Sequence, residues 1–237
     1  MEETSQVRAA IEDLYVAFAS YPLREDTNAC SCCHSPEDEK RLHRTSLRNL
    51  STEHLQQYAT DALLVWGSEA DFKHFLPRIF ELEVLNGWEF VDPEVVFGKL
   101  RHCEWRYWPD TEQHAIEKFL SVLWECILEG QPHYDYGWEI EGWLCGIAQT
   151  VSNLSPYLEA WTGAGTQNAN LNLASFIAET DFADPNSRPT AYWEERAELF
   201  SQVGAWVRGD VVRKKMRAVA AKYPEYDFVE RAYVSLL

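Results

Sequence analysis

The sequence predicts an all-α protein, either an irregular multi-helix bundle or a short superhelix of antiparallel helix pairs, with about ten helices. Apolar residues recur at steps of three and four along nearly the whole chain, and the alternation typical of strands is scarce. Capping residues, glycines and prolines interrupt this pattern at short intervals, as expected where helices end. Because no linker rich in Gly, Ser or Pro divides the 237 residues, we expect one domain over residues 1–237.

The first half of the chain carries the clearest helix signals. Ser51 is a typical N-cap, and Asp92 precedes a proline at the first helical position. Ser68 with Asp71 forms a variant of the capping box. Pro77 lies inside an apolar pattern and predicts either two short helices or one kinked helix. The expected helices cover residues 7–18, 51–66, 68–85, 92–100 and 110–129.

The second half begins with a segment that is nearly free of charge. Residues 142–178 hold Glu159 as their single charged side chain, so we expect this segment to be packed on several sides. Beyond it, the helix that begins at Asp210 carries the one dense basic cluster, Arg213, Lys214, Lys215 and Arg217. Helices are expected over residues 143–154, 156–161, 169–178, 190–206 and 228–236, besides the one from Asp210.

The charge of the chain limits the classes of partner. The net charge is -17, which repels phosphate backbones and anionic lipid headgroups, so we expect no nucleic acid and no membrane partner. Residues 61–141 carry most of this charge, with 17 acidic and 6 basic side chains. The first residues contain neither a basic nor an apolar targeting region, which indicates no secretory signal and a cytoplasmic location.

A cysteine-rich loop is expected at residues 28–45. Cys30, Cys32 and Cys33 could supply three zinc ligands, with His34 or His43 as the fourth, since thiolates and imidazoles suit Zn²⁺. The spacing argues against an ordinary zinc site, because known sites pair cysteines two to four residues apart and adjacent cysteines normally diverge. A purely structural loop is therefore favoured, with a metal site and redox chemistry of the thiols as the alternatives.

Four short motifs carry a resemblance to a known family. They are Cys-x-Cys-Cys at 30–33, Ser-Pro-Glu-Asp-Glu at 35–39, Leu-Arg-Asn-Leu at 47–50, and Trp-Gly followed by Asp-Phe-Lys-His-Phe-Leu-Pro-Arg at 66–78. With these motifs, residues 20–90 resemble a family of bacterial all-helical proteins to which no activity is assigned. Members often have a proline between the first two cysteines, where this chain has Ser31. The resemblance implies a bacterial, cytoplasmic helical protein and no particular reaction.

Common catalytic templates are absent from the sequence. It contains no Gly-x-Ser-x-Gly elbow, no His-Glu-x-x-His pair and no phosphate-binding loop. Asp71 and His74 share a helical face as the Glu-x-x-His pairs of di-iron proteins do, but such sites need two copies and further carboxylates. These observations favour a protein that is not an enzyme.

An aromatic, acidic loop is expected at residues 131–143, at the end of the most acidic block. Aromatic rings supply buried contact area and carboxylates steer a basic protein, so this composition suits an interface. The alternative is a buried aromatic corner between helices. The candidate partner-binding residues are Tyr134, Asp135, Tyr136, Trp138, Glu139 and Glu141.

Two functions from different classes follow from the sequence. The first is a non-catalytic acidic protein without a cofactor that binds a basic protein, as a bacterial immunity protein neutralises a toxin. This hypothesis rests on charge, size and the missing catalytic motifs. The alternative is a helical metal-dependent enzyme or zinc-binding module, with the metal at Cys30, Cys32, Cys33 and His43.

Overall fold

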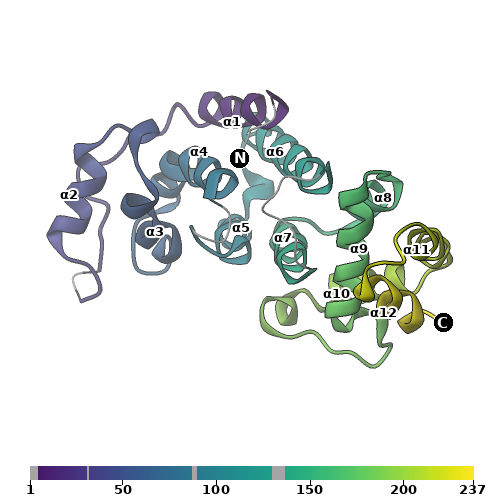
Figure 1. The fold of residues 1–237 in the computed structure, drawn as a ribbon. Coiled ribbons are helices and arrows are strands. Elements are labelled where there is room, and N and C mark those ends of the chain that lie inside the picture. The colour runs from purple at the N-terminus through teal and green to yellow at the C-terminus, as the bar shows by residue number, and fades with distance from the viewer. Residues whose placement is uncertain (1–4, 31, 87–89, 130–136) are drawn as a thin grey trace. The chain divides into compact units, whose positions relative to one another are not determined.

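The computed structural model describes residues 5–30, 32–86, 90–129 and 137–237. These residues form twelve α-helices and short 3-10 helices without a β-strand (Figure 1). The predicted all-α class is therefore confirmed. In the part of the chain that is described, no helix is both long enough and apolar enough to cross a bilayer.

The chain forms two compact units, Glu3–Leu123 and Trp124–Leu237. The boundary between them falls inside the helix α6. The single domain expected over residues 1–237 stays a prediction, which the number of thermal unfolding transitions would test.

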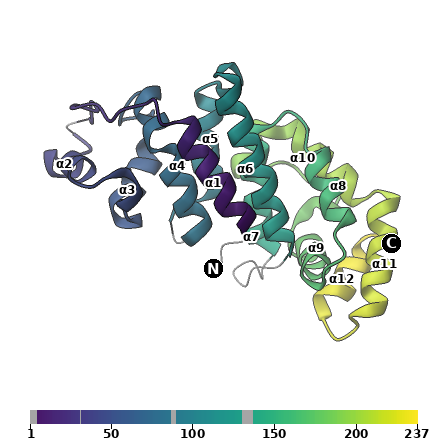
Figure 2. The ribbon, with the colours of Figure 1, turned by 90° about the horizontal axis from the view of Figure 1, so that it is seen from above.

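The N-terminal unit is built around a cluster of phenylalanine rings. Phe80 lies 5.3 Å from Phe97 and 4.9 Å from Phe119, measured between ring centroids, and all three are fully buried. Helix α1 packs against α4 (Figure 2), the helix that contains Phe80. The helices of this unit are α1 (Ser5–Ala17), α2 (Pro36–Arg44), α3 (Thr52–Asp61), α4 (Glu69–Asn86), α5 (Pro93–His102) and α6 (Asp110–Glu129), with 3-10 helices η1 (Leu47–Asn49) and η3 (Trp105–Tyr107).

Two expectations for this unit need correction. Residues 36–44, expected in the loop 28–45, form α2, because Ser35 and Asp38 make a complete capping box with a proline at the start of the helix. The helix expected over 51–66 ends at Asp61 as α3. Leu63 takes a left-handed backbone conformation, with φ of 69°, and the chain reverses before Trp66.

Helix α4 runs through Pro77 as one continuous element, which decides between the two arrangements expected there. A proline inside a helix removes one backbone hydrogen bond, so packing must hold this helix together. Its buried face supplies that packing, since Phe72, Phe75 and Ile79 are each no more than 1% exposed.

A buried carboxylate fixes the start of α4. Asp71 is fully buried and accepts hydrogen bonds from Arg24 Nε at 2.8 Å and from the backbone N–H and hydroxyl of Ser68, both at 2.7 Å. Burial alone would raise the pKa of Asp71, but the hydrogen bonds from Arg24 and Ser68 outweigh it and lower that pKa. Gly67, with φ of 79°, lets the chain turn into this helix.

The C-terminal unit is arranged around α9. This helix packs against α7, α11 and α12, and it buries Asn172, Ser175 and Phe176 (Figure 1). The expectation that the neutral segment 142–178 is packed on several sides is thus confirmed for α9. The helices of this unit are α7 (Gly137–Thr150), α8 (Ser155–Gly163), α9 (Gln167–Glu179), α10 (Ala197–Val207), α11 (Asp210–Lys222) and α12 (Asp227–Ser235), with 3-10 helices η4 (Asp181–Ala183) and η5 (Ala191–Arg196). The helix expected over 190–206 is thus divided into η5 and α10.

We predict that Asp71→Asn lowers the free energy of unfolding at pH 7 by about 2 kcal/mol, because an amide cannot replace the buried charge-assisted hydrogen bonds. Chemical denaturation measures this loss. A carboxyl group with a lowered pKa stabilises the fold above its ordinary pKa, and this contribution is lost as the pH falls. The difference between wild type and variant should therefore shrink below pH 3.8.

The matched control is Glu53→Gln, an exposed carboxylate at the start of α3. It should change stability by only a few tenths of a kcal/mol, about the contribution of a charge near a helix end. Equal losses for Asp71→Asn and Glu53→Gln would contradict the assigned role of Asp71.

Candidate metal centre

A tight backbone turn brings three cysteine sulfurs together. The carbonyl of Cys30 accepts N–H groups from Cys33 and His34, both at 2.9 Å. The turn places the Sγ atoms of Cys30 and Cys32 2.8 Å apart and those of Cys32 and Cys33 3.6 Å apart. All three sulfurs lie within 4.8 Å of one another. The adjacent cysteines, which were expected to diverge, thus point to the same place.

Hydrogen bonds hold both the cysteine turn and the residues before it against the rest of the unit. Its backbone is held by the N–H of Cys30, which donates to the carbonyl of Val65 at 2.9 Å. The preceding residues are held by Thr27, whose hydroxyl accepts the indole N–H of Trp66 at 2.8 Å. Thr27 also donates its N–H and hydroxyl to Glu39 of α2, at 2.6 and 2.7 Å. These contacts fix the sulfur cluster against the turn between α3 and α4.

The two histidines expected near the sulfurs, His34 and His43, lie in different environments. His34 is buried, with its ring 4.2 Å from the indole of Trp66 and its Nε2 3.3 Å from a carboxylate oxygen of Asp61. His43 is exposed on α2. Among the described residues, neither histidine joins the group that the three sulfurs form. The fourth ligand expected from sequence is therefore not brought to the cluster.

The thiols of the cluster do not have equal acidity. The hydrogen bond between the sulfurs of Cys30 and Cys32 lowers the pKa of Cys30 and raises that of Cys32 to about 11. A thiolate is the form that binds metals and reacts with electrophiles, and Cys30 ionises more readily than Cys32.

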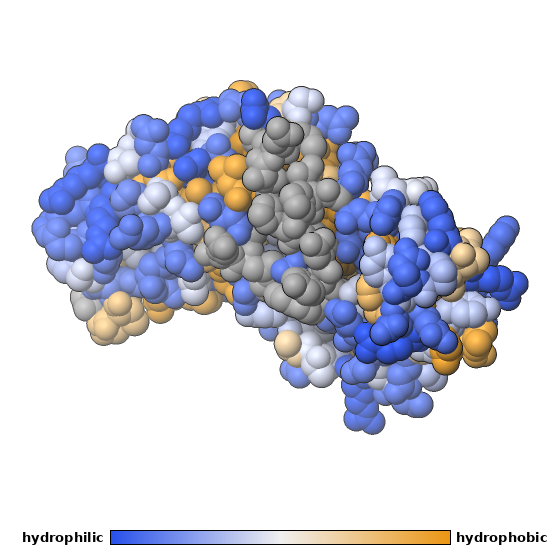
Figure 3. Space-filling view, in the orientation of Figure 1, coloured by the Kyte–Doolittle hydropathy of each residue, from blue (hydrophilic) through white to orange (hydrophobic). Residues whose placement is uncertain are grey.

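The cluster opens to solvent beside an apolar turn. Cys32 and Cys33 are exposed and Cys30 is partly so. Next to them, Leu64 and Val65 leave 66% and 37% of their surface exposed. Figure 3 shows apolar surface at the lower edge of this unit, below α2 and α3. An ion held by the sulfurs would be within reach of molecules in solution.

The remaining cysteines lie apart from this cluster. Cys126 and Cys145 are buried in the C-terminal unit. Burial raises the pKa of Cys103 to about 12, so its thiol stays protonated at neutral pH. These three thiols behave as apolar side chains.

Asp71 and His74, the other carboxylate and imidazole pair considered from sequence, are committed to the fold. The carboxylate of Asp71 is held by Arg24 and Ser68, as described above. The Nδ1 of His74 lies 2.7 Å from the carbonyl oxygen of Tyr21, and burial lowers the pKa of this histidine. This pair is therefore not free to bind an ion.

Only part of the loop expected at 131–143 lies among the described residues. Tyr134, Asp135, Tyr136 and the side chain of Trp138 lie outside the described residues. The expected loop needs correction at its end, because α7 already begins at Gly137 and carries Glu139 and Glu141 on its first turns. Glu141 accepts the indole N–H of Trp193 at 3.2 Å, and burial raises its pKa. This carboxylate contributes to the packing of the unit.

No protein-family model matches the chain, and no curated protein or solved structure matches it either. The expected relation to the bacterial helical family stays a prediction.

We predict that iodoacetamide modifies Cys30 faster than Cys32 at pH 7.5, although Cys32 is more exposed, because the thiolate of Cys30 is the better populated. Peptide mapping by mass spectrometry measures both rates. Replacing Cys32 with Ala removes the hydrogen bond that lowers the pKa of Cys30 and should slow its modification. Cys103→Ala is the control that leaves both rates unchanged, and a faster reaction at Cys32 would refute the assignment.

Proposed function

We propose that the N-terminal unit is a metal-binding module that holds Zn²⁺ through Cys30, Cys32 and Cys33. The observation that carries the proposal is the convergence of three sulfurs within 4.8 Å in a turn that is fixed to Val65. Thiolates are the preferred ligands of zinc and of softer ions. The proposal is for a binding module and not for an enzyme.

The spacing of the sulfurs supports this proposal in part. Zinc–sulfur bonds of about 2.3 Å with tetrahedral angles separate two ligand sulfurs by about 3.8 Å. Cys32 and Cys33 are near this value at 3.6 Å, whereas Cys30 and Cys32, at 2.8 Å, must move apart by about 1 Å. An adjustment of this size is within the reach of side-chain rotation in an exposed turn.

The fourth coordination position is the open part of the site. The described residues bring three sulfurs and no imidazole to the cluster. A site of this kind keeps one position for water or for a ligand from outside the chain, as zinc sites with three protein ligands do. The proposal also requires reduced thiols, which fits the cytoplasmic location expected from the sequence.

We predict that the reduced protein binds one equivalent of Zn²⁺, measured by competition with a chromophoric chelator. Replacing all three cysteines with Ser should weaken binding by more than a hundredfold. Binding couples to folding, so EDTA should lower the melting temperature of the zinc-loaded wild type and leave that of the triple variant unchanged.

The matched control is Cys103→Ser, which removes a thiol outside the cluster and should leave the stoichiometry at one. Zinc binding that survives the triple substitution, or a reduced wild type that binds no zinc, would exclude the proposed site.

A second candidate function is the recognition of a basic protein, such as a toxin that this chain would neutralise. The observation that favours it is a set of exposed carboxylates on α6, in the most acidic block of the sequence: Asp110, Glu117, Glu125 and Glu129. Of these, Glu117 is paired with Arg106. Such a surface accelerates the encounter with a basic partner.

For this candidate we predict that Glu125→Lys with Glu129→Lys on α6 slows association with a partner captured by pull-down by about tenfold at low salt. Trp138→Ala should raise the dissociation rate, with a cost of about 2 kcal/mol if the ring is an anchor. Surface binding kinetics measure both rates. Glu230→Lys, an exposed position on α12, is the matched control. Unchanged association of the double variant would place the interface elsewhere.

A further inference from the structure

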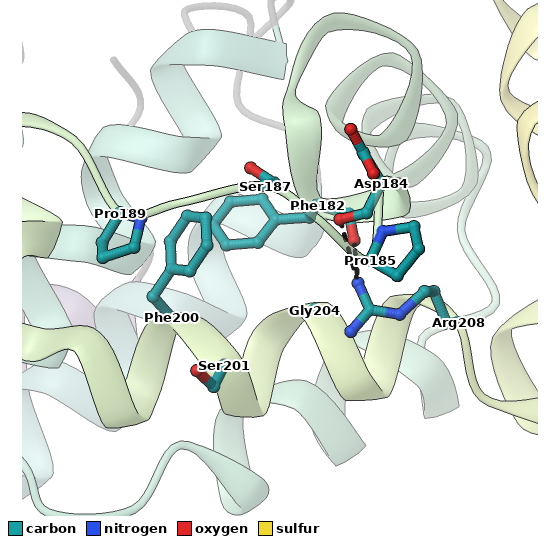
Figure 4. Close-up of a pocket in the computed structure, with 9 residues that line it drawn as sticks. All are labelled: Phe182, Asp184, Pro185, Ser187, Pro189, Phe200, Ser201, Gly204 and Arg208. Carbon is teal, nitrogen blue, oxygen red and sulfur yellow. Dashed lines mark hydrogen bonds between the residues drawn. The ribbon is translucent and has the colours of Figure 1, made fainter.

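A small pocket of about 100 Å³ lies in the C-terminal unit, between α10 and residues 182–189 (Figure 4). Its wall comes from residues 182–189, and its floor is one side of α10. The pocket combines apolar rings at one end with a single guanidinium group at the other. The lining residues are Phe182, Asp184, Pro185, Ser187, Pro189, Phe200, Ser201, Gly204 and Arg208.

The apolar end is a rigid wall. The rings of Phe182 and Phe200 lie 4.6 Å apart between centroids, and both side chains are buried. Pro185 and Pro189 line the same pocket on the connecting segment, where their rings restrict the backbone. An apolar group of a few carbon atoms would lose its contact with water against this wall.

The polar end is formed by Arg208, just beyond the last turn of α10. Its Nη1 donates to the carbonyl of Phe182 at 2.8 Å, which holds the guanidinium group beside the first residue of the segment 182–189. The group lies across Gly204, where a Cβ atom would stand 3.0 Å from Nη1 and 3.3 Å from Nη2. The glycine therefore leaves the space that the guanidinium group occupies.

The charge of Arg208 has no counterpart in its surroundings. In the described residues no carboxylate lies within ion-pair distance of this side chain, and Nη2 and Nε carry donors that meet no described acceptor. The nearest acid in the lining, Asp184, directs its carboxylate to the N–H of Asn186 at 2.8 Å. Figure 4 shows that carboxylate turned away from the guanidinium group. The pocket thus has a fixed positive end with unused hydrogen-bond donors.

We propose that this pocket binds a small carboxylate, with its apolar group against Phe182 and Phe200 and its carboxylate on Arg208. A guanidinium group matches a carboxylate in charge and in donor geometry. The hydroxyl of Ser201 donates to the carbonyl of Ala197, so its proton is not available to the ligand and the carboxylate relies on the donors of Arg208. The ligand chemistry is that of a short-chain or aromatic acid, or of a peptide that ends in a small apolar residue with a free carboxylate.

The test compares acids with neutral molecules of the same shape. Benzoate and 3-methylbutanoate are titrated into the full chain, beside benzamide and 3-methylbutanamide, with binding followed by amide NMR shifts. Each acid should bind at least tenfold more tightly than its amide, because the charge-assisted hydrogen bond to Arg208 is lost in the amide. Equal affinities of acid and amide would overturn the proposal.

Variants locate the binding at this pocket. Arg208→Gln should weaken benzoate binding at least tenfold, whereas Arg213→Gln, an exposed arginine on α11 outside the lining, should not change it. Asp184→Asn keeps an acceptor for Asn186 but removes a negative charge, so it should strengthen binding about threefold or more. This second variant remains informative if Arg208→Gln does not fold. Unchanged binding in Asp184→Asn and in a folded Arg208→Gln would refute the site.

Peptides distinguish the two sources of the carboxylate. The tetrapeptide Gly-Gly-Ala-Val is titrated with a free and with an amidated C-terminus. Tighter binding of the free peptide than of benzoate assigns the pocket to chain ends, and tighter binding of benzoate assigns it to small acids. Failure of every carboxylate to bind the wild type would overturn the proposal for both sources.

Discussion

The buried indole of Trp66 is the contact on which the cysteine turn depends. Its ring meets Tyr58 of α3 at 5.5 Å and His34 at 4.2 Å, and its N–H is taken by Thr27. One side chain therefore joins the body of the unit, the histidine that follows the sulfurs and the segment that precedes them. Loss of this ring would leave a cavity beside His34 and Tyr58 and remove the hydrogen bond to Thr27.

This arrangement explains why the turn can hold three thiols in close contact. Neighbouring sulfurs gain little from one another, and an ionised cluster repels itself. Contacts that involve no sulfur atom stabilise the turn instead, such as the backbone hydrogen bond between Cys30 and Val65. A comparable balance exists at the start of α4, where the cost of burying the carboxylate of Asp71 is offset by hydrogen bonds from Arg24 and Ser68.

Local signals in the sequence predicted the helix starts well. Helices α5, α6 and α11 begin at Pro93, Asp110 and Asp210 as expected, because a proline or an acidic residue in the first turn is a signal local to the chain. The end of α3 could not be predicted in this way. The apolar spacing continues to Trp66, and the left-handed conformation of Leu63 follows from the contacts of the turn, which no local preference of leucine favours. Helix α2 was missed because Leu42 is its only buried residue in the described structure, although its capping box is visible in the sequence.

The candidate site was predictable as a set of residue types and not as a geometry. The three cysteines stand out by their rarity, but the role of His34 depends on Asp61 and Trp66, which lie about 30 residues away along the chain. The pocket at Arg208 had no sequence signal, since it joins an ordinary helix end to a segment whose prolines indicate only a connection.

The carbonyl of Val65 that holds Cys30 belongs to the same turn that leaves Leu64 and Val65 in solvent. A binding partner that covered this apolar turn and shifted its backbone would also change the distance between the sulfurs. By thermodynamic linkage, a metal ion that changed the positions of the sulfurs would also change the affinity of the turn for that partner. If the proposed metal site is occupied, binding at this surface and binding at the thiols would be linked through the hydrogen bond between Cys30 and Val65.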